Sequence, residues 1–419
     1  MNKLPLNSER LRFSGIISLL FWLLCSLSIL AKEPPYLILV SFDGFRWDYP
    51  TRGISPNLDY IKQNGVSAIS LEPVFPSKTF PNHISIITGM YPENHGIIMN
   101  YFDDPYHHQS YGLNDSLSIR DPRWYLGEAF WETAERQGIT CASYFWPGSE
   151  LKLPYRKPTY RELYEHKRPY ETRVKGVLKW LQLPPEKRPH FITLYMHETD
   201  SKGHRYGPNS PEVNDAIRLL DSMLGKLIAG LKKIHMMEKT NIVVVSDHGM
   251  TEVDTFRVVN IEAMLKKYRV TITGSGPVMM IQPADEQLHQ VYEELKEKAA
   301  HYRVYRREEV PSYFHYSHHP FISSLVLVAD LGWELQTDAG VKRLRKKKSA
   351  VGGDHGYDNH QLDMHGIFYA MGPAFKKGYR TGTIRNIDIY PMLCKIFHIM
   401  PRQNIDGKLE RIAFVLRGE

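Results

Sequence analysis

Residues 36–44 read YLILVSFDG, a mostly apolar run that ends in an aspartate and a glycine. A continuous apolar run of this length, without alternation of polar residues, is typical of a strand that is buried on both faces of a sheet. Two prolines, Pro34 and Pro35, stand immediately before it. We therefore expect a buried strand over 36–42 with Asp43 at its carboxyl end.

Outward from this strand, short β-rich runs alternate with longer amphipathic runs. Further strands are predicted over 66–71, 140–146, 191–196, 241–246, 277–282, 324–329 and 366–371. Helices are predicted over 57–63, 125–136, 171–181, 211–233 and 285–299. This alternation predicts one α/β domain with a doubly wound, mostly parallel sheet and helices on both faces.

The composition is that of an ordinary globular protein, with 419 residues, 42% of them hydrophobic and 24% charged. The net charge is +7, partly from a basic run over 342–348, which we interpret as a solvated surface. No zinc-finger spacing or basic stripe with interleaved aromatics indicates sequence-specific nucleic-acid binding. Outside the N-terminal segment only Cys141 and Cys394 remain, too few for a disulfide scaffold, and whether they pair stays open.

The N-terminal segment has the layout of an export signal. Nineteen uncharged, mostly apolar residues lie between Arg12 and Lys32, after further basic residues. We predict a signal peptide or signal anchor over 1–31, a catalytic domain over 34–401 and a C-terminal tail over 402–419. Cleavage and retention as a membrane anchor both stay open, since nineteen residues just span a bilayer. In either case the rest of the chain is exported, to the periplasm, the cell surface or the medium.

Carboxylates and histidines follow three of the predicted strands. Ligands of open α/β sheets bind beyond the carboxyl ends of the strands, so these side chains are candidates for one site. A fourth cluster, GDHGYDN over 353–359, adds a histidine in a glycine-rich loop. A mixture of carboxylate and imidazole fits zinc better than magnesium. The candidate metal ligands are Asp43, Asp200, His204, Asp247, His248 and His355.

The segment PSKTFPNH over 76–83 precedes a run with helical spacing of apolar residues. Thr79 thus stands at a predicted helix start, where free backbone N–H groups favour an anion such as an alkoxide or a phosphate. The residues alone leave two interpretations open, a helix cap or a nucleophile.

Together these segments resemble the nucleotide pyrophosphatase/phosphodiesterase family of the alkaline phosphatase superfamily. The resemblance covers about 36–401 and is carried by FDGFR at 42–46, KTFPNH at 78–83, GMYPE at 89–93, WPGS at 146–149, DHGM at 247–250 and HGYDN at 355–359. It covers the catalytic domain alone, without the small cysteine-rich repeats and nuclease-like domain of multidomain animal members.

The resemblance implies an alkaline-phosphatase-like fold and a site with two Zn²⁺ ions. One zinc is expected on Asp200, His204 and His355, and the other on Asp43, Asp247, His248 and the Thr79 hydroxyl. Thr79 is implied as the nucleophile, and Asn100 as a contact of the phosphate. Phe80 and Tyr164 fall where nucleotide-cleaving relatives stack an adenine. Asn82 and His365 are not expected to take the roles of Asn100 and His355, and His83 is interpreted as a packed rather than a catalytic histidine.

We therefore expect an exported two-zinc hydrolase that cleaves nucleotide phosphodiester or phosphoanhydride bonds to nucleoside 5′-monophosphates. The reaction would pass through a covalent threonyl-nucleotide intermediate. The substrates would be small molecules such as ATP or dinucleoside polyphosphates. An alternative with the same metal site is a phosphodiesterase for lysophospholipid or choline phosphoesters. A third, of another class, is a zinc-bearing binding protein without turnover.

Overall fold

The structure, a computed structural model, describes residues 33–346 and 351–418. The predicted signal segment 1–31 and the end of the basic run lie outside the described residues. Among the residues that are described, no helix combines the length and apolar character needed to cross a membrane. Residues from Pro35 onward form one unit, which is described below.

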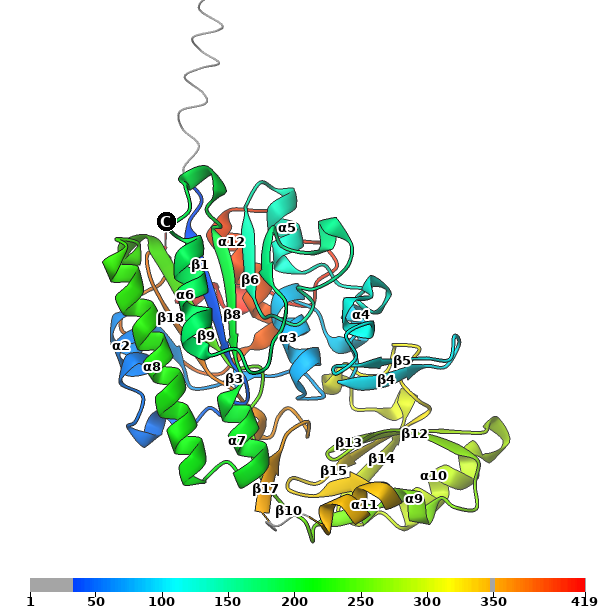
Figure 1. Cartoon of the computed structure of the whole chain (residues 1–419). Helices are drawn as coiled ribbons and strands as arrows, with labels where there is room; N and C mark the ends of the chain where they lie inside the picture. Colours follow the sequence, from blue (N-terminus) through cyan, green and yellow to red (C-terminus); the bar gives the residue numbers. More distant parts are fainter. Residues whose placement is uncertain (1–32, 347–350, 419) are drawn as a thin grey trace, which may run out of the picture. The chain divides into compact units, whose positions relative to one another are not determined.

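A sheet of eight strands forms the centre of this unit, in the order β19-β2-β18-β9-β1-β8-β6-β7 (Figure 1). Strand β18 runs antiparallel to both of its neighbours, and the other pairings are parallel. The strands are β1 Tyr36–Phe42, β2 Val66–Ala68, β6 Cys141–Tyr144, β7 Tyr160–Glu162, β8 Phe191–Met196, β9 Thr240–Val245, β18 Phe368–Met371 and β19 Tyr379–Thr381.

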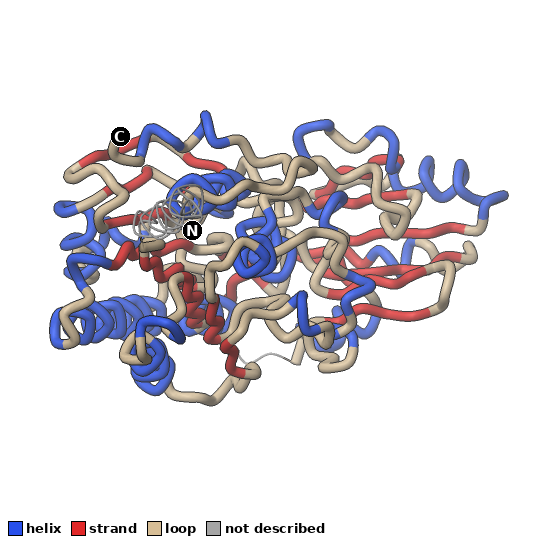
Figure 2. Tube along the Cα trace, turned by 90° about the horizontal axis from the view of Figure 1, so that it is seen from above, coloured by secondary structure: helices blue, strands red, loops and turns tan. Residues whose placement is uncertain are grey.

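Both faces of the central sheet are covered by helices. Along β1, Ile38 and Val40 face one apolar core and Leu37 and Leu39 face the other, and all four are buried. One core is closed by α2 (Pro56–Asn64), α6 (Tyr170–Trp180) and α8 (Pro211–Lys233), and the other by α3 (Thr79–Thr88), α5 (Phe130–Arg136) and α12 (Ile389–Phe397). The predicted doubly wound, mostly parallel sheet is therefore confirmed. Figure 2 gives a view of the strands and helices from above.

A second sheet lies between α9 and α11 in the chain and is antiparallel throughout, in the order β12-β13-β15-β14. Its strands are β12 Val270–Ser275, β13 Val278–Pro283, β14 Tyr302–Arg306 and β15 Leu325–Ala329, and its helices are α9 Ile261–Met264, α10 Leu288–Glu297 and α11 Asp338–Leu344. The predicted strands 277–282 and 324–329 exist, but they pair here and not in the central sheet. A tight turn with Gly274 and Gly276 at positive φ joins β12 to β13 and forces the antiparallel pairing.

Four small ribbons and two further helices complete the fold. The ribbons pair β3 (Leu71–Glu72) with β20 (Ile384–Arg385), β4 (Tyr101–Asp104) with β5 (Gln109–Gly112), β10 (Thr251–Asp254) with β17 (Val351–Asp354) and β11 (Val258–Asn260) with β16 (Glu334–Gln336). The helices are α4 (Pro92–His95) and α7 (Glu198–Tyr206). The predicted helix 125–136 begins only at Phe130, because the Glu132 side chain accepts the Ala129 N–H at 3.1 Å and starts the helix there.

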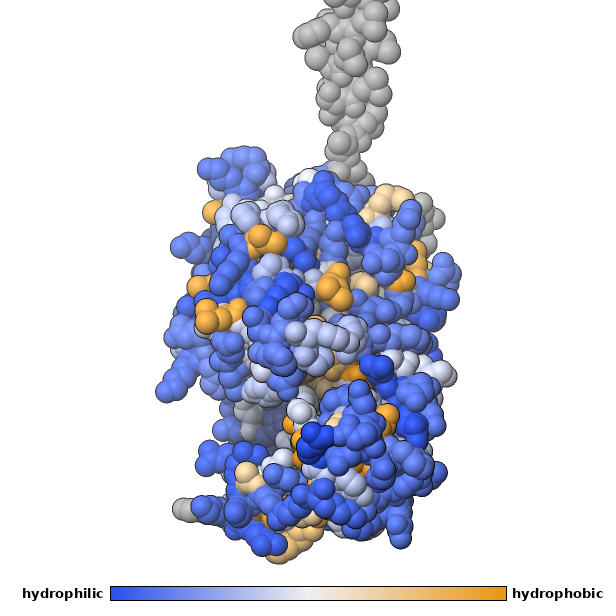
Figure 3. Space-filling model, turned by 90° about the vertical axis from the view of Figure 1, so that its right-hand side faces the viewer, coloured by the Kyte–Doolittle hydropathy of each residue, from blue (hydrophilic) through white to orange (hydrophobic). Residues whose placement is uncertain are grey.

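The C-terminal residues pack onto the central unit. Ile412 and Val415 are fully buried beside α12, and Phe375 forms a bridge with Leu416. Cys141 and Cys394 are free, buried thiols, which resolves the question of a disulfide. The face in Figure 3 is largely hydrophilic, with apolar side chains in small separate spots, as expected for a folded unit whose apolar residues lie inside.

Candidate active site

The central strands β9, β1 and β8 are neighbours, so their carboxyl ends meet at one edge of the sheet. Asp43 follows β1, Asp247 and His248 follow β9, and α7 begins directly after β8. The α7 backbone is tied to this edge, since the Asp200 N–H donates to the Asp43 carbonyl at 3.1 Å. Because β1 lies between β9 and β8, Asp43 at its end lies beside the candidate ligands that follow the two neighbouring strands.

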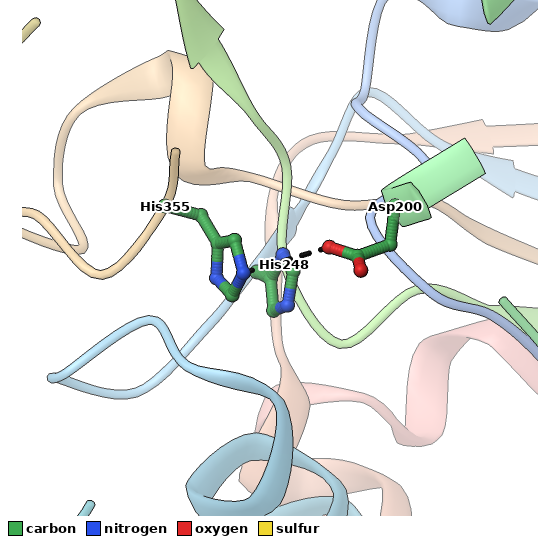
Figure 4. A group of neighbouring side chains, drawn as sticks. All are labelled: Asp200, His248 and His355. Atoms are coloured by element: carbon green, nitrogen blue, oxygen red, sulfur yellow. Dashed lines mark ion pairs between the residues drawn. The ribbon is translucent and has the colours of Figure 1, made fainter. Parts of the chain in front are cut away.

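The first candidate ligand group spans one turn of α7 and the loop after β17. Asp200 and His204 stand four residues apart on α7, and the His204 Nε2 lies 3.2 Å from Asp200 Oδ1. The His355 Nε2 lies 3.1 Å from His204 Nε2 and 3.5 Å from Asp200 Oδ1. Figure 4 shows the Asp200 carboxylate facing the imidazoles of His248 and His355, whose ring centroids are 3.4 Å apart.

The second candidate ligand group surrounds the Nε2 atom of His248. This atom lies 3.0 Å from Asp247 Oδ2, 3.3 Å from Asp43 Oδ1 and 3.2 Å from the Thr79 hydroxyl oxygen. His248, His355 and both aspartates here are buried, whereas the His204 side chain is 41% exposed. The structure thus brings all seven predicted metal-site residues together at one place.

The hydrogen bonds around these side chains orient them in a way that suits cation binding. Three histidines use Nδ1 toward a backbone carbonyl at 2.8 Å: His204 toward Gly353, His248 toward Gly249 and His355 toward Ser77. A neutral imidazole that donates from Nδ1 carries a lone pair on Nε2, the arrangement typical of metal-ligating histidines. One buried oxygen each of Asp43, Asp200 and Asp247 lacks a hydrogen-bond partner. Carboxylate oxygens without hydrogen bonds that face the Nε2 atoms of these imidazoles fit zinc ligation, so the residues present suit two metal ions.

The electrostatics of the site agree with this interpretation. Burial, with the nearby Asp247, raises the pKa of Asp43, while Tyr195 donates to its Oδ2 at 2.5 Å. Burial opposes the ionisation of Asp247, but the contacts of its carboxylate with His248 and His83 together outweigh burial and lower its pKa. Burial likewise disfavours a charged His204, but Asp200 outweighs it and raises the pKa of His204 to about 9. Several carboxylates crowd one buried place, a charge pattern that bound cations would relieve.

Thr79 lies at the first position of α3 and does not cap the helix. The capping position is Lys78, whose side chain makes no cap hydrogen bond. The Phe80 N–H donates to Asn100 Oδ1 at 3.0 Å, which leaves the Asn100 amide hydrogens free to face the site. The Thr79 N–H belongs to the first-turn amides that a helix cannot pair internally. A phosphate beside Thr79 would therefore meet donors from both residues.

Asn82 and His365, which we did not expect to contact the phosphate or a metal, make structural contacts instead. Asn82 accepts the Val74 N–H at 2.7 Å and donates to the carbonyls of Pro76 and Lys78, so it braces the turn before Thr79. His365 bonds Ser70 through Nδ1 at 2.9 Å and belongs to neither ligand group.

His83 is fully buried directly behind the site. Its Nε2 bonds the Ser41 hydroxyl at 2.8 Å, and its Nδ1 lies 2.9 Å from the Thr79 carbonyl and 3.3 Å from Asp247 Oδ2. The grouping of Asp43, His83 and Asp247 is compact enough for a metal. We prefer His248 as the ligand, because its Nε2 faces the other candidate ligands, whereas the two nitrogens of His83 are bonded to the Ser41 hydroxyl and the Thr79 carbonyl.

A pocket of about 530 Å³ opens from the metal-site residues, and we call it the aromatic pocket. Thr79, Asn100 and His355 lie at one end, and Phe80 and Tyr164 line its wall. Tyr164 is 45% exposed and packs edge-on to Phe145 at 5.3 Å. A pocket lined by aromatic rings together with polar side chains that could hold a phosphate suits a nucleotide.

The sequence analysis missed several residues that line this pocket. Glu150 is buried, pairs with Arg120 at 2.8 Å and accepts the Tyr164 N–H at 2.5 Å. His197 is buried and stacks on His166, with ring centroids 4.0 Å apart. Glu150 follows the WPGS motif, and His197 directly follows β8. Their positions beside a motif and beside a strand end are the features of the sequence that could have identified them.

Comparisons with known proteins agree with this geometry. The family model described as Type I phosphodiesterase / nucleotide pyrophosphatase matches residues 37–358, more than half of the chain. Human ectonucleotide pyrophosphatase/phosphodiesterase family member 5 is 36% identical over 372 residues, 88% of this chain and 76% of that protein. The bis(5′-adenosyl)-triphosphatase enpp4 of Xenopus laevis is 36% identical over 389 residues, 93% of this chain and 83% of that protein.

Human family member 1 is 35% identical over 89% of this chain, which spans only 41% of that longer protein. Among solved structures, murine family member 5 superimposes with a TM-score of 0.85 at 33% identity, covering 91% of this chain and all of that one. A threonine-to-alanine variant of that protein, described as inactive, was solved in complex with AMP and also gives a TM-score of 0.85, with 92% of this chain covered. The chain belongs to the type I phosphodiesterase/nucleotide pyrophosphatase family.

Proposed function

We propose that this protein is a two-zinc hydrolase that cleaves nucleotide phosphodiester or phosphoanhydride bonds and releases nucleoside 5′-monophosphates. The observation that carries the proposal is the aromatic pocket, which joins the Thr79 hydroxyl and the unpaired carboxylate oxygens to the aromatic wall of Phe80 and Tyr164. A binding protein without turnover would not need a threonine hydroxyl 3.2 Å from a metal-type imidazole.

The metal ligands proposed for one zinc are Asp200, His204 and His355, and those for the other are Asp43, Asp247, His248 and the Thr79 oxygen. Two bound zinc ions would neutralise the negative charge on the attacking and departing oxygens of the reacting phosphate. The unpaired oxygens and the Nδ1 bonds to backbone carbonyls support this assignment.

Thr79 is the proposed nucleophile. Its Oγ1, after loss of the hydroxyl proton to solvent, attacks phosphorus in line, so that the Oγ1–P bond forms as the bond to the leaving oxygen breaks. The Asn100 amide and the Thr79 N–H hold a non-bridging oxygen as charge accumulates on it. Water then attacks the threonyl-nucleotide from the opposite side, which releases the nucleoside 5′-monophosphate and restores the Thr79 hydroxyl.

The proposed substrates are small nucleotides such as ATP or dinucleoside polyphosphates, held by stacking between Phe80 and Tyr164. The bis(5′-adenosyl)-triphosphatase activity for which the Xenopus relative is named and the AMP complex of the murine one support a nucleotide over a lysophospholipid or choline phosphoester. We further propose export by residues 1–31 ahead of a catalytic domain over 34–401, with cleavage or membrane anchorage of that segment left open.

The decisive experiment is hydrolysis of the p-nitrophenyl ester of thymidine 5′-monophosphate by the purified, zinc-loaded protein. Release of p-nitrophenol that is abolished by a chelator and restored by Zn²⁺ is the expected result, and no release would refute the proposal. A panel of ATP, diadenosine polyphosphates and glycerophosphocholine then separates the substrate classes. Phe80→Ala should weaken turnover of the nucleotides and leave that of glycerophosphocholine unchanged, whereas the reverse pattern would favour the lipid-type substrate.

A further inference from the structure

A second, smaller hollow of about 220 Å³ adjoins the site on the far side of Asn100. We call it the Lys78 pocket. It shares Asn100 with the aromatic pocket, but it is bordered by Lys78 and Asp354 in place of Thr79 and Phe80. Its other wall comes from the second sheet and the ribbon beside it, with Ser275 at the end of β12 and Gln336 at the end of β16.

The position of the Lys78 pocket relates it to the departing group. Asp354 forms a compact group with His204 and His355. These two histidines belong to the ligand group without Thr79, so the zinc proposed there would face the departing oxygen. Thr79 belongs to the other ligand group and does not border this pocket. In an in-line displacement the leaving group departs on the side opposite the nucleophile. A nucleotide stacked in the aromatic pocket with its phosphate at Asn100 would therefore direct its leaving group into the Lys78 pocket.

The charges of this pocket are already balanced. Its lining carries one cation, Lys78, and one anion, Asp354, and these form an ion pair at 3.2 Å with side chains only 12% and 15% exposed. Asp354 Oδ1 also accepts the His355 N–H at 2.7 Å. No further charged side chain of the described residues lines it.

The neighbouring glycines keep this pair in place. A Cβ on Gly356 would lie 2.3 Å from Lys78 Cε, and one on Gly276 would lie 2.7 Å from Asp354 Oδ2. Both glycines also have positive φ, so other residues would be strained there. The lysine stem and the carboxylate are therefore closely packed, and the ammonium is held by Asp354 instead of projecting freely toward a ligand.

Building on the proposed function, we propose that the Lys78 pocket receives the leaving group and selects uncharged, hydroxyl-bearing ones over pyrophosphate. The volume holds about seven waters, which suits a sugar-sized alcohol. Ser275, Gln336 and the asparagine amide offer hydrogen bonds to hydroxyls. A pyrophosphate would bring several negative charges to a pocket whose one ammonium is already neutralised, and charges that lose water without a partner are strongly penalised. Among the substrates of the proposed function, the favoured class is thus the phosphodiester between a nucleoside 5′-phosphate and an alcohol, ahead of ATP and dinucleoside polyphosphates, whose leaving groups are charged.

Three substrates that transfer the same thymidylyl group test this proposal. They are the dinucleotide TpT, whose leaving group is an uncharged nucleoside hydroxyl, dTTP, whose leaving group is pyrophosphate, and the p-nitrophenyl ester as reference. The key variant is Ser275→Lys, which adds an unpaired ammonium to the pocket wall. Its matched control is Thr271→Lys, an exposed position on the same strand and outside the pocket lining. Assays at about 0.15 M salt limit long-range effects of charge.

We expect Ser275→Lys to raise kcat/KM for dTTP, relative to the reference ester, at least about fivefold and to leave or lower that for TpT. Thr271→Lys should change neither ratio. Lys78→Met should depress dTTP turnover at least tenfold more than TpT turnover. Equal effects of the two added lysines, or unchanged ratios in both, would overturn the assignment of this pocket. Turnover of the reference ester tests the proposed function itself. A protein that does not hydrolyse this ester would refute the proposed function, whereas one that hydrolyses it without the expected change in ratios would refute only the leaving-group assignment.

Discussion

The two ends of the aromatic pocket are built differently. At the metal end, Asp43, Asp247 and His248 follow neighbouring strands of the central sheet and are almost fully buried. At the aromatic end, Phe80 is only partly buried and Tyr164 lies on a loop with 45% of its surface exposed. The difference indicates that the buried sheet edge fixes the chemistry, whereas the more exposed side chains of α3 and of the loop after β7 set the substrate. Changes at the two ends should therefore have different kinetic signatures.

The largest effect is expected from Thr79→Ala at the metal end. Loss of the proposed nucleophile should lower kcat on the p-nitrophenyl ester by at least about 1,000-fold, because alanine offers no hydroxyl in its place. The metal content, measured by atomic emission, should stay near that of the wild type. Thr79→Ser, which keeps a hydroxyl, is the control and should retain much more activity. If Thr79→Ala stayed within tenfold of the wild type, a covalent threonyl intermediate would be ruled out.

His355→Ala should remove one metal ligand without touching the aromatic wall. We expect its zinc content to fall from two ions toward one per chain and kcat to fall by more than about 100-fold, since even outer-shell changes often cost roughly 10- to 100-fold in affinity. The matched control is His365→Gln, a nearby buried histidine outside both ligand groups, which should keep two zinc ions. Equal zinc loss in the two variants would mean that His355 is not a specific ligand.

Zinc binding should be strongly pH-dependent because of His204. Its pKa is raised to about 9 in the metal-free protein, mainly because Asp200 outweighs the effect of burial. Below that pH the imidazolium must lose its proton before Nε2 can bind a metal. The zinc affinity should therefore rise about tenfold per unit between pH 7 and 9, roughly 100-fold in all, and level off above pH 9. Calorimetry in buffers of different ionisation enthalpy should detect about one proton released at pH 7.5, and no release would contradict this.

At the aromatic end the expected effect is smaller and appears in KM. Tyr164→Ala should raise KM for nucleotides about tenfold, from the loss of about 1–2 kcal/mol of stacking, with kcat changed less than about threefold. Tyr164→Phe keeps the ring, loses only the hydroxyl contact to His166 at 2.9 Å, and should stay near the wild type. A fall in kcat alone, with unchanged KM, would indicate that Tyr164 acts on the chemistry and not on base binding.

The sequence was most informative where local patterns coincide with the geometry. The apolar run over 36–42 correctly predicted a buried strand, and the helix over 211–233 was predicted with its observed bounds. The candidate ligands were found because each stands at a strand end or in a short motif, and strand ends of a parallel sheet share one edge. Periodicity and motif spacing were sufficient for these features.

The pairing of strands that lie far apart in the chain could not be predicted from local sequence patterns. The runs over 277–282 and 324–329 read as strands, but only the tight β12–β13 turn and the pairing with β14 assign them to a second sheet. The same applies to Glu150 and His197, whose importance depends on what packs against them. Strand periodicity describes a run's conformation and burial, whereas its partner is set by contacts far along the chain.

Backbone carbonyls orient the three histidines, and this determines which substitutions the site should tolerate. Since Gly249, Gly353 and Ser77 contribute main-chain oxygens, no side-chain replacement can delete these acceptors directly. A Cβ on Gly249 would lie 2.1 Å from the Asp363 carbonyl oxygen, and one on Gly353 would lie 2.6 Å from that of Gly203. In a saturation mutagenesis screen, the two glycines should therefore be intolerant because of crowding. Ser77 should be intolerant for a different reason, because its buried hydroxyl donates to the Tyr357 carbonyl at 3.0 Å and accepts the Gly356 N–H at 3.1 Å.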